Sequence, residues 1–172
     1  MHDQLAVLAE VAVGLAGFSS IIVVFRRRSA TDAWEPEDAF RFKIMLEGSL
    51  VAGLFAISPS ATAGLGLGPN LLWPAHSAAL LIYLVLNLLR RWQQFRSLPA
   101  GSLSPGIART MLCGGAITMM VQALNVVGLG IPQGAGPYLF GVSWLITYSG
   151  IMFYRLITAP IVTIDSNGTP AA

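Results

Sequence analysis

Residues Leu5 to Arg28 read LAVLAEVAVGLAGFSSIIVVFRRR, and the interpretation of the whole chain starts from this stretch. It is apolar from Leu5 to Phe25 except for one charge, Glu10, and it ends in a cluster of arginines. At about 1.5 Å per residue, a helix of roughly twenty residues spans the hydrocarbon layer of a bilayer. Because arginines behind a membrane helix stay in the cytoplasm, this helix is predicted to begin outside the cell and end inside.

The composition of the whole chain indicates a membrane protein. Of its 172 residues, 55% are hydrophobic and 10% are charged, whereas about a quarter of the residues of a soluble domain are charged. The net charge is only +2 and the cations flank apolar runs, so binding to nucleic acid is not expected. The chain is long enough for four or five crossings in a single transmembrane domain, residues 1–172.

Four further apolar segments follow the first, and each is predicted to cross the bilayer. They are residues 42–63, 71–89, 107–129 and 138–157, after the first span at residues 5–25. Pro59 is the weak point of the second span, because a proline inside a helix removes a backbone hydrogen bond and kinks or ends the helix. This span is therefore predicted either to end near Pro59 or to continue past it. Residues 158–172 are predicted to form a cytoplasmic tail.

The basic residues test this topology. All ten lysines and arginines fall on the inner side when five helices run with the N-terminus outside and the C-terminus inside. A four-helix or inverted arrangement would scatter them over both sides. The sequence therefore predicts an all-α, integral membrane bundle of five helices, located in the cytoplasmic (inner) membrane.

Two carboxylates, Glu10 and Glu47, fall within the predicted spans. An acidic side chain at the bilayer centre costs about 2.5–3.5 kcal/mol on insertion scales, and such residues often carry ions or protons. Glu10 lies near the outer end of its helix. Gly14 and Gly17 share its face, which is therefore expected to pack against another helix.

Glu47 lies about one turn inside the inner boundary of the second span. A structural ion pair with Lys43, Arg91 or Arg109 is the favoured interpretation of this carboxylate, and a role in ion or proton transport is the alternative.

Polar residues on three other spans recur at helical spacing, which places each set on one helical face. These sets are His76, Tyr83, Asn87 and Arg91 on the third span, Gly115, Thr118, Gln122 and Asn125 on the fourth, and Ser143, Thr147, Gly150 and Tyr154 on the fifth. Gln122 and Asn125 fall at the depth of Glu10, so the three are expected to meet in a polar cluster near the outer side. Such faces either line a water-filled path or form interhelical hydrogen bonds worth about 0.6 kcal/mol each.

Common catalytic motifs are missing from the sequence, which has no Gly-rich phosphate loop, no HExxH and no G-x-S-x-G. No metal and no cofactor are expected either. The single cysteine, Cys113, lacks the partners of a zinc site or a disulfide and is expected to be a small buried side chain. The chain is therefore not expected to be an enzyme.

The leading hypothesis is a homo-oligomeric ion channel or transporter for cations or protons. Five short helices rarely enclose a pore, and Glu10, Gln122, Asn125 and Glu47 are the candidates to line its polar constrictions. The alternative is a non-catalytic structural, assembly or sensory subunit that acts through a protein partner. A lipid-handling protein is a weaker third hypothesis. The inner arginines are expected to contact anionic lipid headgroups, at about 1 kcal/mol for each basic residue.

Overall fold

The structure, a computed structural model, describes residues 2–28, 36–66, 68–96 and 105–158. These residues form five helices: α1 (His2–Arg28), α2 (Pro36–Ala63), α3 (Pro69–Arg96), α4 (Pro105–Val127) and α5 (Ala135–Thr158). The prediction of an all-α chain with five helices is confirmed. Apart from Thr158, the predicted tail at residues 158–172 lies outside the described residues, as do the side chains of Arg26, Arg27 and Arg28.

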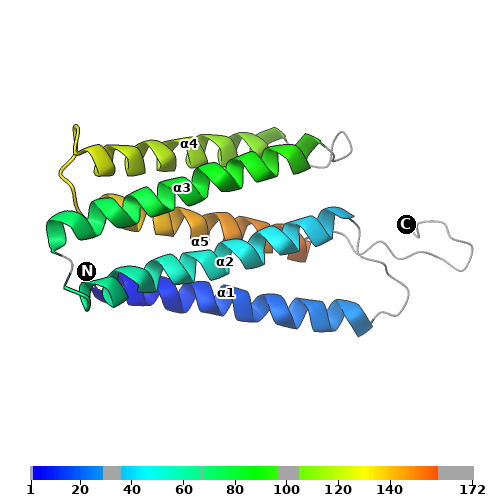
Figure 1. Cartoon of the computed structure of the whole chain (residues 1–172). Helices are drawn as coiled ribbons and strands as arrows, with labels where there is room; N and C mark the ends of the chain where they lie inside the picture. The colour runs from blue at the N-terminus through cyan, green and yellow to red at the C-terminus, as the bar shows by residue number, and fades with distance from the viewer. Residues whose placement is uncertain (1, 29–35, 67, 97–104, 159–172) are drawn as a thin grey trace, which may run out of the picture.

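The helices run alternately up and down in a bundle (Figure 1). At one end α1, α3 and α5 finish and α2 and α4 begin. We call it the basic end, because every lysine and arginine whose side chain is described lies in the helix halves that meet there. The opposite end carries the N-terminus and is called the His76 end. The clustering of cations predicted from the sequence therefore holds for the described part of the bundle.

Proline and glycine mark the helix boundaries. α2, α3 and α4 each begin with a proline, Pro36, Pro69 and Pro105, where the missing N–H has no helical partner to lose. α4 ends before Gly128, which adopts a φ of 75° and donates its N–H to the Leu124 carbonyl at 2.8 Å. That left-handed conformation is open to glycine at low cost, and it caps the last turn of the helix.

α5 is the central helix and packs against each of the other four. Its buried residues recur every three or four positions; they are Ala135, Tyr138, Gly141, Val142, Leu145, Ser149, Met152 and Leu156. Gly141 allows a close approach, because a Cβ there would lie 2.6 Å from both the Gln122 amide nitrogen and a Leu80 methyl carbon. The polar set predicted on the fifth span, by contrast, does not mark this inward face, because Tyr154 is 68% exposed and Thr147 is also exposed.

Polar side chains lie among the buried apolar residues inside the bundle, and many large apolar side chains face outward. Buried polar residues include Ser49, Ser77, Thr118, Gln122, Asn125 and Ser149. Exposed apolar residues include Leu54, Ile57, Ile82, Leu89 and Met120, each more than half exposed. In a soluble domain, by contrast, large apolar side chains are mostly buried and polar ones mostly exposed. It fits a bundle whose outer surface meets lipid and whose polar groups pair internally.

Four of the described helices are long and apolar enough to cross a membrane, which makes the chain a multi-pass membrane protein. The spans are Ala39–Ala63, Asn70–Arg91, Arg109–Val127 and Ala135–Thr158. α1 is not among them within the described residues, so its crossing stays a prediction. α2 continues past Pro59 to Ala63, which decides between the two predicted endings. The expectation for Cys113 is wrong: its side chain is exposed on α4 rather than buried.

Candidate functional site

Polar side chains gather toward each end of the bundle, and fully buried apolar residues lie between these two groups. Along α3, His76 and Ser77 lie toward the His76 end, and Asn87 and Arg91 toward the basic end. Leu80 lies between these pairs and is fully buried. Val142 on α5 and Ala52 on α2 belong to the same apolar cluster and are also fully buried.

The polar group near the basic end is built from three helices and consists of Glu47 on α2, Tyr83, Asn87 and Arg91 on α3, and Tyr148 on α5. We call it the basic-end cluster. Asn87 is its hub, because it stands four residues from both Tyr83 and Arg91 and so shares their face. Its amide nitrogen donates to the Tyr83 hydroxyl at 2.8 Å and to Glu47 Oε1 at 3.3 Å. The Asn87 side-chain oxygen accepts a hydrogen bond from Arg91 Nε.

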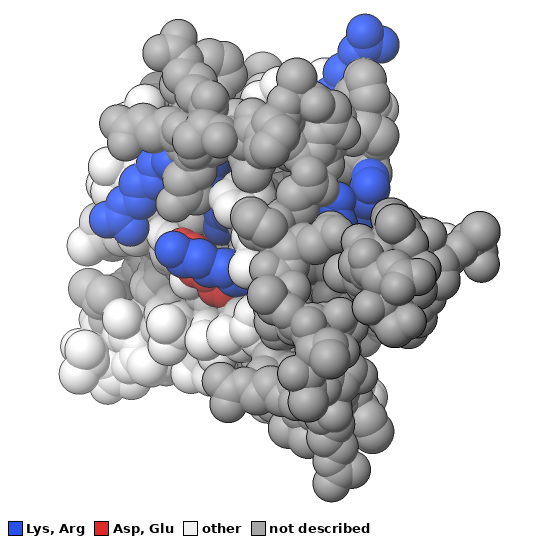
Figure 2. All heavy atoms as spheres, turned by 90° about the vertical axis from the view of Figure 1, so that its right-hand side faces the viewer, with Lys and Arg blue, Asp and Glu red and all other residues white. Residues whose placement is uncertain are grey.

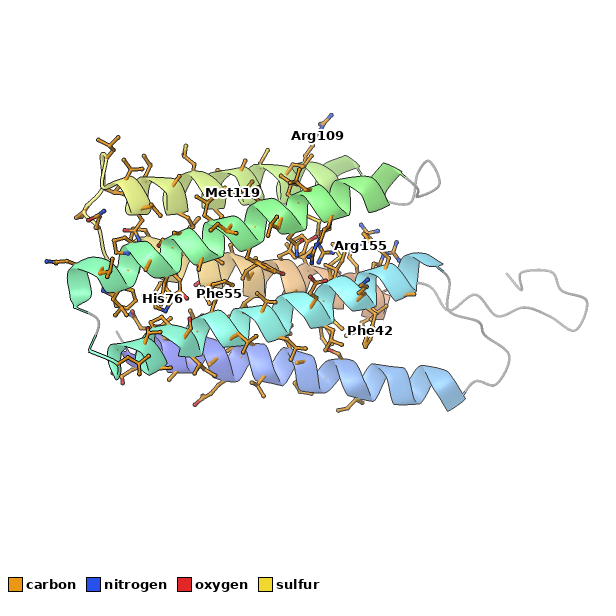
Figure 3. The ribbon with its side chains drawn as sticks, viewed as in Figure 1. Phe42, Phe55, His76, Arg109, Met119 and Arg155 are labelled. Atoms are coloured by element: carbon orange, nitrogen blue, oxygen red, sulfur yellow. The ribbon has the colours of Figure 1, made fainter. Side chains whose placement is uncertain are left out.

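Arg91 completes the cluster by pairing with Glu47. Its Nη2 lies 3.5 Å from Glu47 Oε2, and its guanidinium carbon lies 5.9 Å from the centre of the Tyr148 ring. The Arg91 side chain is 10% exposed and the Glu47 side chain is 36% exposed. Of the three ion-pair partners predicted for Glu47, Arg91 is therefore the one that the structure shows. Arg109 points away from the bundle (Figure 3).

A cavity of about 170 Å³ opens beside this ion pair. Its walls are Phe40, Lys43 and Glu47 from α2 and Asn87, Arg90 and Arg91 from α3. Lys and Arg side chains surround a small acidic spot on this end of the molecule (Figure 2). The cavity wall thus carries three cations and one carboxylate, and that carboxylate is already engaged by Arg91 and Asn87.

The polar group near the His76 end starts from His76 itself, which is 8% exposed. His76 Nδ1 lies 2.7 Å from the Leu72 carbonyl, so this nitrogen carries the proton and donates. His76 Nε2 lies 3.2 Å from the Thr62 hydroxyl on α2, and the imidazole meets the Tyr138 ring edge-on. Both His76 and Phe55 lie inside the bundle between α2 and α3 (Figure 3). His76 therefore ties α2, α3 and α5 together.

Tyr138 compensates for Pro59 inside α2. Proline has no N–H, so the Phe55 carbonyl, four residues earlier, loses its helical hydrogen bond. The Tyr138 hydroxyl donates to this carbonyl from α5, and the Ser58 hydroxyl donates to it at 3.2 Å. Tyr138 and Pro59 are both fully buried. This pairing explains how α2 continues past Pro59 without leaving a buried carbonyl unsatisfied.

Replacing Tyr138 with phenylalanine is expected to destabilise the protein by about 1 kcal/mol, because it removes one hydrogen bond to a buried carbonyl. In a Pro59→Ala background the alanine N–H can bond the Phe55 carbonyl, so the same replacement should cost less than about 0.5 kcal/mol. Equilibrium unfolding of the four proteins in detergent micelles measures this coupling. Equal losses in both backgrounds would show that Tyr138 does not act through Pro59.

Asn125 connects α4 to α3 and to the loop before α5. Its amide nitrogen donates to the Ser77 hydroxyl at 2.7 Å and to the Gly134 carbonyl at 3.1 Å, and its side-chain oxygen accepts from the Gly134 N–H at 2.9 Å. Gln122, one turn away, donates to the Pro137 carbonyl at 2.7 Å. Both side chains are fully buried. Their contacts therefore lie within the chain.

Glu10 does not join Gln122 and Asn125. α1 packs against α2 and α5 but has no contact with α4, so the predicted cluster of these three side chains is not formed within the chain. Residues Leu5, Ala12 and Ser19 form the buried face of α1. Glu10 is exposed on another face of α1.

Gly14 and Gly17 share the exposed side of α1 with Glu10, and no atom lies within 4 Å of where a Cβ would stand at either glycine. The expectation that this face packs against another helix is therefore not met by the described helices of the same chain. We call Glu10, Gly14 and Gly17 the open face of α1.

The polar residues predicted on the third and fourth spans all lie on partly or fully buried faces of α3 and α4. Tyr83, Asn87 and Arg91 meet in the basic-end cluster, and Thr118 is fully buried on α4. Sequence reasoning missed Tyr138, Tyr148 and Thr62. Of these three, only Tyr138 could have been anticipated from the sequence. Pro59 leaves the carbonyl four residues earlier without a helical donor, so a donor from another part of the chain is needed.

Among the described residues, no group of three His, Cys, Asp or Glu side chains could hold a metal ion. Comparison with protein-family models, with curated proteins and with solved structures finds no match to this chain.

Proposed function

We propose that this protein is a small ion-conducting protein of the cytoplasmic membrane that passes cations or protons as a homo-oligomer. In this proposal the N-terminus is outside, the basic end faces the cytoplasm, and all five helices cross the bilayer. The positive-inside rule supports that orientation, since the described cations gather at one end of the bundle. The proposal assigns the protein no catalytic activity.

The observation that carries the proposal is the exposed carboxylate of Glu10 on the open face of α1. A charged side chain that faces lipid costs about 2.5–3.5 kcal/mol at the bilayer centre, which is the upper bound for Glu10 because it lies nearer the outer end of α1. That cost falls when the carboxylate lines water or meets another subunit. Gly14 and Gly17 leave room for the backbone of a second helix to approach closely on the same side of α1.

The close packing inside the bundle favours an ion path between subunits over one through the interior of a single subunit. Leu80, Val142 and Ala52 are fully buried between the two polar groups. Among the described residues, Ser49 Oγ and Gln122 Oε1 are the only buried side-chain polar atoms without a hydrogen-bond partner. Gln122 and Asn125 are therefore assigned to helix packing. Carboxylates from several copies of α1 would form a ring that favours cations.

Ion flux into liposomes tests the proposal. The purified protein is reconstituted with a pH-sensitive dye inside the vesicles, and a proton gradient or a potassium gradient is applied. Wild type is expected to raise flux well above that of empty liposomes. Glu10→Gln is expected to lower it at least tenfold, because the neutral amide no longer attracts the cation.

The matched control is Asp3→Asn, which removes an exposed carboxylate from the first turn of the same helix. It should leave flux within about twofold of wild type, because Asp3 precedes the apolar stretch and lies in solvent. Flux in Glu10→Gln equal to wild type would remove Glu10 from the path. Wild-type flux no greater than that of empty liposomes would remove conduction altogether.

The second candidate function is a non-catalytic subunit that binds a partner protein through the open face of α1. The hydrogen bonding of Asn125, Gln122 and Tyr138 within the chain favours it, since those side chains then serve packing alone. Gly14→Leu would separate the two functions. If the protein is a partner-binding subunit, wild type should co-purify with a protein of different mass and show no ion flux. Gly14→Leu should then lose the co-purifying protein.

A further inference from the structure

The cavity at the basic end carries more positive charge than its own carboxylate balances. Lys43, Arg90 and Arg91 face a single Glu47, and Arg91 is the cation that pairs with it. Lys43 and Arg90 are exposed and have no acidic partner among the residues that the structure describes. Two cations at the mouth of the cavity are therefore left for an anion from outside the chain.

The cavity is also large enough for such a group. Its volume of about 170 Å³ exceeds several times the roughly 30 Å³ that one water molecule takes up in the liquid. Asn87 and Arg91 on one wall are fixed by their bonds to each other and to Glu47, so this wall is preorganised. A phosphate group that enters the cavity meets this wall without any rearrangement of the ion pair.

The position of the cavity indicates the source of that anion. Lys43 lies one turn inside the start of the span Ala39–Ala63, and Arg90 lies one residue before the end of the span Asn70–Arg91. The cavity therefore sits at the boundary between the apolar and polar parts of both helices. In a bilayer, that boundary is the depth at which phospholipid phosphates are found.

Exposed leucines continue from both cations toward the bilayer interior. Leu50 follows Lys43 by seven residues and Leu86 precedes Arg90 by four, so each shares the helical face of its cation. Leu50 is 53% exposed and Leu86 is 50% exposed. Each helix thus presents a cation at headgroup depth and an apolar surface below it. A phospholipid has a charged headgroup followed by apolar acyl chains and so can contact both parts of this surface. A free phosphate ion has no apolar part that could contact the leucines.

We propose that the cavity between α2 and α3 binds the phosphate group of an anionic phospholipid. Lys43 and Arg90 contact the phosphate oxygens, Arg91 and Asn87 form the fixed inner wall, and the acyl chains lie along the faces of Leu50 and Leu86. Glu47 holds Arg91 in place and does not contact the lipid. This binding does not depend on ion conduction and would equally serve a partner-binding subunit.

Titration of the purified protein in zwitterionic detergent with short-chain lipids tests the proposal, and native mass spectrometry counts the bound molecules. The probes are phosphatidylglycerol, phosphatidylcholine and inorganic phosphate. Wild type is expected to bind one phosphatidylglycerol per chain at least tenfold more tightly than either of the other two. Lys43→Gln with Arg90→Gln is expected to weaken phosphatidylglycerol binding at least tenfold.

Two further variants keep the test falsifiable. Arg109→Gln removes an exposed cation that points away from the bundle, and it should change the affinity less than twofold (Figure 3). Lys43→Arg with Arg90→Lys keeps both charges and should keep the affinity within about threefold of wild type. Equal binding of phosphatidylglycerol and phosphatidylcholine, or full affinity in the double glutamine variant, would overturn the proposal. Equally tight binding of inorganic phosphate would overturn the assignment to a lipid.

Discussion

Arg91→Leu is expected to lower the free energy of unfolding by about 3 kcal/mol, the lower end of the range for breaking a buried ion pair. Among the described residues, the replacement leaves the Glu47 carboxylate with the Asn87 amide at 3.3 Å as its one remaining partner. It also leaves the Asn87 side-chain oxygen without its donor. The lower end of the range applies because the Glu47 side chain is 36% exposed and retains contact with the cavity.

A double-mutant cycle measures this coupling. Glu47→Leu together with Arg91→Leu should be more stable than Arg91→Leu alone, because an apolar pair leaves no buried charge behind. The neighbouring Arg90→Leu serves as the control and should stay within about 0.5 kcal/mol of wild type, since Arg90 is exposed. Unfolding is followed by circular dichroism in zwitterionic detergent without anionic lipid. Equal losses for Arg90→Leu and Arg91→Leu would contradict the basic-end cluster.

Asn125→Leu is expected to cost about 2 kcal/mol, which corresponds to three hydrogen bonds of about 0.6 kcal/mol each in a membrane bundle. The three bonds join Asn125 to Ser77 and to both backbone groups of Gly134. Asn125→Asp keeps the acceptor for the Gly134 N–H and loses both donors. It should therefore also be destabilised, because a carboxyl oxygen then faces the Gly134 carbonyl, which can only accept, at the former donor position.

Gln133→Ala is the matched control for Asn125. Gln133 lies next to Gly134 in the loop between α4 and α5. Its side chain donates to the Val126 carbonyl at 2.9 Å, but it is exposed to solvent. Its removal should change stability by less than about 0.5 kcal/mol. The same unfolding assay compares the variants. A loss in Gln133→Ala as large as in Asn125→Leu would contradict the assignment of Asn125 as the side chain that joins α3, α4 and the loop.

Local pattern was enough to predict the helices and much of their inner faces. The apolar runs predicted that the chain forms five helices, because each run has the length that a helix across a bilayer requires. Helical spacing also placed Tyr83, Asn87 and Arg91 together on α3, and Arg91 was one of the three cations predicted to pair with Glu47. Each of these predictions depends on residues within one helix or on opposite charges at the same depth.

The order of helices around the bundle could not be predicted. Glu10 and Asn125 were expected to meet because they share a depth, but α1 and α4 lie on different sides of the bundle. On α5, serine and threonine spacing pointed to the wrong face, since Thr147 bonds its own helix at the Ser143 carbonyl. A hydroxyl that is satisfied within its helix carries no information about the neighbouring helix. Cys113 was misplaced because apolar sequence neighbours say little about burial when the outer surface meets lipid.

Labelling of single cysteines in intact cells tests the membrane orientation most directly. In a Cys113→Ala background, one variant carries Leu65→Cys and the other carries Gly106→Cys. Leu65 is 81% exposed at the His76 end, and Gly106 is exposed in the first turn of α4 at the basic end. A membrane-impermeant maleimide should label residue 65 in intact cells and residue 106 only after the membrane is permeabilised. Labelling of residue 106 in intact cells would contradict a bundle whose basic end lies in the cytoplasm.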